Sequence, residues 1–143
     1  MIQAQDTFLH IIADILPSLT VHPLRTDHAH PENESLQMNA VNIEFTIADL
    51  RVQVSQVYTS IDVINDDEQT ARTQALQIAQ LLQQGGVAPE MDYSGLAATP
   101  PTPAAPTGRN IFWNPNAVRF RPVNSGDSYF RFNCTLVLNF NNS

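Results

Sequence analysis

The last part of the chain contains a long stretch in which apolar and polar residues alternate. From 128 to 140 the sequence reads Ser-Tyr-Phe-Arg-Phe-Asn-Cys-Thr-Leu-Val-Leu-Asn-Phe, so that every second side chain from Phe130 to Phe140 shares one apolar face. This alternation predicts a half-buried β-strand. At about 3.3 Å per residue the strand would span roughly 40 Å, longer than most strands of small domains. We therefore expect it to be the central strand of a sheet.

The chain has 143 residues, of which 43% are apolar, and this suits a single domain, 1–143, with one hydrophobic core. Its first residues, Met-Ile-Gln-Ala-Gln-Asp, do not begin a basic segment followed by an apolar run. We therefore expect neither export nor a membrane segment, and place the chain in a cytosol. The single Cys134 lies on the apolar face of the predicted strand, where a core thiol is expected, and it excludes an internal disulfide.

Helical spacing of apolar residues occurs twice, over 3–16 and over 65–84. Each segment predicts an amphipathic helix. The second should be capped by Asn65 or Asp66 and should end at Gly85-Gly86.

The remaining strands are predicted between and after these helices. A brief strand is expected around 19–24, and alternation over 40–64 predicts two or three antiparallel strands. Taken with the C-terminal strand, this order predicts an α+β fold: a mainly antiparallel sheet, two helices packed on one face, and a long C-terminal hairpin.

Residues 87–110 contain five prolines, which remove many of the N–H donors that a helix or sheet needs. We predict a proline-rich extended arm or loop of polyproline character. A connection of this length inside a compact domain usually has a function or is disordered. The two alternatives are an arm that lies on a neighbouring subunit and a mobile segment.

The penultimate strand is predicted over 117–122, antiparallel to the C-terminal strand. If the apolar residues of both strands are to share a face, Phe120 lies opposite Phe132 and Arg121 opposite Arg131. Arg119, Arg121 and Arg131 would then occupy the outer face together. Like charges directly across a strand pair are unfavourable unless solvent screens them or negative charge covers them.

Charge is unevenly distributed along the chain, whose net charge is −7. Residues 1–92 contain thirteen Asp or Glu and three Arg, whereas residues 93–143 contain one Asp and four Arg, and the chain has no lysine. This balance argues against direct affinity for nucleic acid. Opposite charges on separate parts of one protomer favour a head-to-tail contact between copies, which closes into a ring if the rotation permits.

The predicted subunit interface consists of three arginines and three acids at the start of the second helix. Its residues are Arg119, Arg121, Arg131, Asp66, Asp67 and Glu68. For the acids, helix capping is the alternative interpretation. A second cluster, His22 together with His28 and His30 of the polar loop 26–35, is a candidate metal site, and a solvated loop is the simpler interpretation. We find no catalytic motif, so we predict neither an enzyme nor a cofactor.

The chain resembles the tail terminator or tail completion proteins of long-tailed, siphovirus-like bacteriophages. The resemblance lies in element order: a leading helix at 3–16, strands at 40–64, a helix that opens Asp-Asp-Glu-Gln at 66–69, and a closing strand that reads Phe-Arg-Phe-Asn-Cys-Thr-Leu-Val-Leu-Asn-Phe. The proline-rich segment departs from the compact loop expected there.

The resemblance implies a structural virion protein that forms a homo-oligomeric, hexameric ring in the tail and is assembled in the host cytoplasm. Its implied partners are copies of itself, the tail tube protein and a head-neck connector protein, with DNA passing through the lumen without specific binding. The alternatives are a phage neck, head-completion or minor tail tube subunit, and a small soluble ligand- or metal-binding domain.

Overall fold

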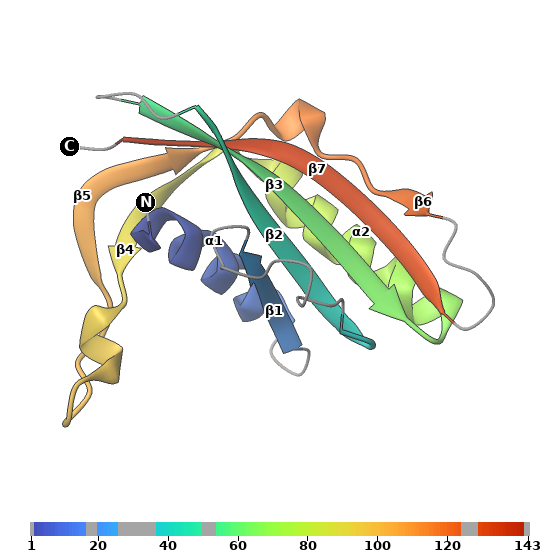
Figure 1. Cartoon of the computed structure of the whole chain (residues 1–143), viewed down its shortest axis with the longest axis horizontal. Coiled ribbons are helices and arrows are strands. Elements are labelled where there is room, and N and C mark those ends of the chain that lie inside the picture. Colours follow the sequence, from blue (N-terminus) through green and yellow to red (C-terminus); the bar gives the residue numbers. More distant parts are fainter. Residues whose placement is uncertain (1, 17–19, 26–36, 50–53, 124–128, 142–143) are drawn as a thin grey trace.

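The computed structural model describes residues 2–16, 20–25, 37–49, 54–123 and 129–141. Within these ranges the chain forms two α-helices and seven β-strands, an α+β fold (Figure 1). The elements are α1 (Ile2–Ile15), β1 (Thr20–Arg25), β2 (Ala40–Asp49), β3 (Val54–Asn65), α2 (Glu68–Gln84), β4 (Val87–Asp92), β5 (Ala105–Phe112), β6 (Arg121–Val123) and β7 (Phe130–Asn141). Two 3-10 turns, η2 (Ser94–Ala97) and η3 (Pro115–Ala117), connect some of them.

The sheet has the order β1-β2-β3-β7-β5-β4, and β6 also pairs with β7. β1 runs parallel to β2, and the other pairs of described strands are antiparallel. β7 pairs with β3 along its whole length, with β5 near its C-terminal end and with β6 near its start. The prediction of a mainly antiparallel sheet around the C-terminal strand is therefore confirmed.

One face of the sheet and both helices enclose the core. Strand register places Val57 opposite Leu138 and Ile61 opposite Cys134, and all four side chains are buried. Each fully buried large apolar side chain contributes about 1.5–3 kcal/mol to folding before entropy is considered. α1 joins this core through its buried side chain Phe8, whose ring lies 6.4 Å from that of Phe45 and 6.1 Å from that of Trp113. α2 contributes five residues to the same core, Ala71, Ala75, Ile78, Ala79 and Leu82.

The start of α2 differs by one or two residues from the prediction. Asp67, rather than Asn65 or Asp66, caps the helix, and its carboxylate accepts hydrogen bonds from Thr70 N at 2.9 Å and Thr70 Oγ1 at 2.6 Å. Asn65 is still the last residue of β3, and its side chain accepts a hydrogen bond from Asp67 N. The helix ends before Gly85, as predicted.

The prediction that 87–110 lacks sheet structure is wrong. β4 and β5 form an antiparallel hairpin, with Val87 opposite Phe112 and Met91 opposite Pro106. β4 is the last strand of the sheet, and Pro106 lies in a part of β5 that pairs with β4 alone, since β5 meets β7 only near Phe112. Strands tolerate proline where one side is unpaired. The turn of this hairpin points away from the body of the molecule (Figure 1).

The predicted register of the closing hairpin is also wrong, by two residues. Arg121 lies opposite Asn133 and Val123 opposite Arg131, so Arg121 and Arg131 are not a cross-strand pair. β6 begins at Arg121, after the predicted start at 117, because the turn η3 precedes it. Asn114 caps this turn, and Val118 N donates a hydrogen bond to the carbonyl oxygen of Pro115. A shift of two residues preserves the face to which each side chain points.

Candidate assembly surface

Arg131 finds its partner within its own protomer. Its Nε donates a hydrogen bond of 2.7 Å to Oδ1 of Asp62, and Nδ2 of Asn133 donates one of 3.0 Å to the same oxygen. Asp62 lies directly opposite Asn133 in the β3–β7 pair, and its side chain is only 6% exposed. The expectation that Arg131 faces a carboxylate of a neighbouring subunit is therefore corrected, because β3 supplies the carboxylate.

Arg119 and Arg121 are exposed and line a pocket of about 270 Å³ beside Asn133 and Thr135. The ion pairs between described residues involve other arginines, so neither guanidinium has a carboxylate partner in this part of the chain. The two guanidinium groups are two residues apart on one exposed segment, so this surface is positively charged. We call this pair the arginine edge. It can accept anionic groups from outside the protomer.

An apolar groove of about 410 Å³ lies on the other side of the arginine edge. α2 contributes Leu76, which is 57% exposed, and the facing segment contributes Phe120, with Phe132 from β7. Arg72, Arg119 and Arg121 also line this groove. Positive charge and exposed apolar surface therefore meet at the same place, which we call the α2–β6 groove.

The acids at the start of α2 are mostly engaged locally. Asp67 is the helix cap, and hydrogen bonds from Thr70 lower the pKa of its carboxyl group. Glu68 pairs with Arg72 at 2.8 Å on the exposed surface of the helix. Asp66 is exposed, and its backbone N–H donates to Asn39 Oδ1. Capping therefore accounts for Asp67, whereas Asp66 and Glu68 remain on the surface.

The predicted metal site lies outside the residues whose side chains the structure describes. His22 lies in β1, but its side chain, like the whole of His28 and His30, is outside the part of the chain that the structure describes. Within that part, no group of three or more His, Cys, Asp or Glu side chains could hold a metal ion. Cys134 is a buried core residue, and burial raises the pKa of its thiol.

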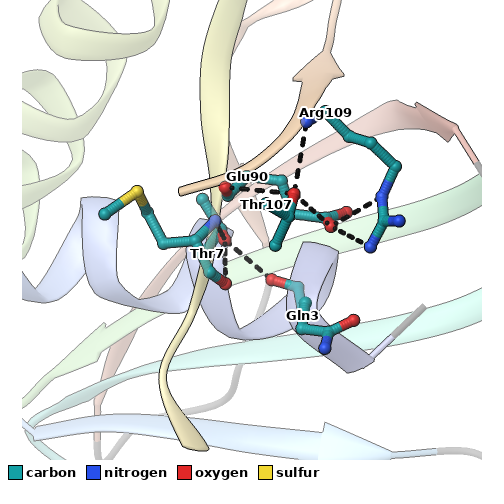
Figure 2. Close-up of polar contacts among 6 residues, drawn as sticks. Gln3, Thr7, Glu90, Thr107 and Arg109 are labelled. Atoms are coloured by element: carbon teal, nitrogen blue, oxygen red, sulfur yellow. Dashed lines mark hydrogen bonds and ion pairs between the residues drawn. The ribbon is translucent and has the colours of Figure 1, made fainter. Parts of the chain in front are cut away.

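A polar cluster at the base of the β4–β5 hairpin was missed by sequence reasoning. Glu90 is buried, and one of its carboxylate oxygens accepts a hydrogen bond of 2.9 Å from Thr107 Oγ1 and two from the guanidinium of Arg109 (Figure 2). Next to it, Thr7 Oγ1 of α1 accepts a hydrogen bond from Met91 N at 2.9 Å. The cluster therefore holds the hairpin to itself and to the first helix.

A bulge in β5 brings this cluster together. Glu90 is the single residue between two paired positions of β4, whereas β5 has three residues there, from Thr107 to Arg109. Gly108, in the middle, has a φ of 85°, which is accessible mainly to glycine. The available signal was the isolated Glu90 and Arg109 in a segment with few charges, but their separation of 19 residues suggests no contact by itself.

Comparisons with known proteins do not add to this picture: neither the protein-family models nor the curated proteins that were searched give a match to the chain. Among the described residues, neither helix is long and apolar enough to span a membrane.

Proposed function

We propose that the chain is a structural protein that assembles head to tail with copies of itself into a ring, as a tail terminator of a long-tailed bacteriophage. The observation that carries the proposal is the arginine edge. Arg119 and Arg121 are exposed beside an apolar groove, without a carboxylate from the described part of their own protomer, in a chain of net charge −7.

The positive charge and the apolar surface of the groove both favour contact with another copy. A neighbouring acidic protomer can neutralise the two guanidinium groups, and burial of the apolar groove would add hydrophobic stabilisation. Arginine also suits such interfaces because its planar group pairs with carboxylates through two hydrogen bonds. The contact joins different surfaces of identical chains, and contacts of this kind close into rings or extend into filaments.

The resemblance in element order supports the more specific assignment. A ring that ends tail-tube polymerisation would contact the tail tube protein on one side and a head-neck connector protein on the other. DNA would pass through its lumen, and an acidic chain would repel phosphate rather than retain it. A neck, head-completion or minor tail tube subunit is the second candidate, because the same head-to-tail contact would serve it equally well.

Light scattering after size-exclusion chromatography tests the assembly. The wild-type chain should elute as an oligomer, and Arg119→Gln with Arg121→Gln should shift it to the monomer. Gln77→Glu with Gln80→Glu is the matched control, because it lowers the net charge by the same amount at exposed positions of α2. A monomeric wild-type chain at high micromolar concentration contradicts the proposal.

Electron microscopy of rings mixed with tail tubes separates the two candidate functions, since a tail terminator should cap tube ends.

A further inference from the structure

The turn of the β4–β5 hairpin, residues 93–104, is an exposed projection without a charged residue. Its sequence is Tyr-Ser-Gly-Leu-Ala-Ala-Thr-Pro-Pro-Thr-Pro-Ala, and Leu96 is 46% exposed. Figure 1 shows it extending away from the sheet and both helices. Contact of apolar surface with water is unfavourable, and exposed apolar patches commonly mark contact sites.

Backbone hydrogen bonds and a ring contact stabilise the turn. Thr102 N donates to the carbonyl oxygen of Gly95 at 2.8 Å, and Ala98 N donates to the same oxygen at 3.2 Å. At its base, the ring of Tyr93 stacks on that of His10 in α1, with 3.8 Å between the ring centres. A projection that is already ordered loses little conformational entropy on binding.

The α2–β6 groove is an apolar surface of matching character at the other end of the molecule. Figure 1 places β6 and the hairpin turn at opposite ends of the long axis, so a protomer cannot fill its own groove with its own turn. The groove is lined by Leu76, Phe120 and Phe132. Aromatic-lined grooves are a common binding site for proline-rich segments, which need little further ordering.

We infer that the hairpin turn of one copy docks into the α2–β6 groove of the next copy. In this arrangement Leu96 and the prolines of the turn cover Leu76 and Phe120, and Asp92 at the base of the turn approaches the arginine edge. The inference rests on the proposed head-to-tail assembly and names the two surfaces that meet. A second copy is the occupant because the same chain carries an uncharged projection with an acid, Asp92, beside it at one end, and an apolar groove with two exposed arginines at the other.

Two single substitutions test this pairing. Leu76→Glu places a carboxylate in the groove, and Leu96→Glu places one on the turn. Both positions are exposed, so each variant should fold with an unchanged circular dichroism spectrum. Each alone should raise the concentration needed for assembly by roughly tenfold or more. Gln77→Glu, which adds the same charge to an exposed neighbour of Leu76, should assemble like the wild type.

Mixing the two variants gives the decisive measurement. The turn of the Leu76→Glu copy and the groove of the Leu96→Glu copy are both intact, so a mixture should form a dimer with one copy of each and stop there. Native mass spectrometry with one variant labelled with nitrogen-15 identifies that dimer. If the wild type assembles and both variants assemble equally well, the inference is overturned and the proposed ring stands. A mixture that remains monomeric also overturns it. A monomeric wild type instead overturns the proposed function.

Discussion

The guanidinium of Arg109 donates two hydrogen bonds to one carboxylate oxygen of Glu90, from Nε at 3.1 Å and from Nη2 at 2.9 Å. The side chain of Glu90 is 2% exposed and that of Arg109 is 31% exposed. The pair spans the bulge at which the β4–β5 hairpin leaves the body. The position of the projecting turn therefore depends on a buried charge and on the guanidinium of Arg109 that pairs with it.

Arg109→Met should lower the free energy of unfolding by about 3–5 kcal/mol, because it leaves the Glu90 carboxylate buried without its cation. Arg72→Met is the matched control: its partner Glu68 is exposed, and loss of such a surface pair costs about 1 kcal/mol or less. Urea denaturation at a concentration where the chain is monomeric measures both, because Arg72 also lines the α2–β6 groove. A double variant, Glu90→Leu with Arg109→Met, should be more stable than Arg109→Met alone. Equal, small losses in the two single variants would show that the buried pair does not stabilise the hairpin.

Arg131 and Arg121 should differ in their effect on the isolated protomer. Arg131→Ala removes the donor to the buried Asp62 and should cost about 1–3 kcal/mol of stability. Arg121→Ala changes an exposed side chain and should stay within about 0.5 kcal/mol. Urea denaturation at a concentration where the chain is monomeric separates these effects from assembly. Destabilisation by both substitutions would mean that Arg121 also has a partner within its protomer.

Asp67 should make stability depend on pH at the acidic end. Hydrogen bonds from Thr70 lower the pKa of its carboxyl group below the usual 3.8, so the folded state binds a proton less readily than the unfolded state. The stabilisation is therefore present above about pH 4 and is lost as the pH falls through the lowered pKa. Asp67→Asn should have a lower urea midpoint than the wild type at pH 7, and the difference should shrink by pH 3. A difference that is constant with pH would contradict this role.

Cys134 should react with thiol reagents only when the protein opens. Its side chain is 1% exposed and burial raises the pKa of the thiol, so little thiolate is accessible in the folded state. Labelling at pH 8 should be slower than in 8 M urea by roughly a thousandfold or more. The rate should increase in Arg109→Met if Arg109 stabilises the whole domain. Rapid labelling of the native wild type would contradict a core position for this thiol.

Local pattern was sufficient to predict most of the individual elements. Alternation is a property of neighbouring residues, and it predicted β7 and the strands within 40–64, just as helical spacing predicted α1 and α2. Because side chains alternate between the two faces of a strand, the sequence also predicted correctly that Arg121 and Arg131 share a face, although the register itself differs by two residues.

Pairing between distant segments was decided only in the tertiary structure. The five prolines of 87–110 indicated a segment with too few N–H donors for a sheet. The segment nevertheless forms β4 and β5, because it lies at a sheet edge, where a missing donor costs little. Likewise, nothing near Arg131 in the sequence identifies Asp62 as its partner, because the two are 69 residues apart and meet only when β3 lies beside β7. A side chain's face follows from its immediate neighbours, but its partner depends on which strand is adjacent, and long-range packing sets that order.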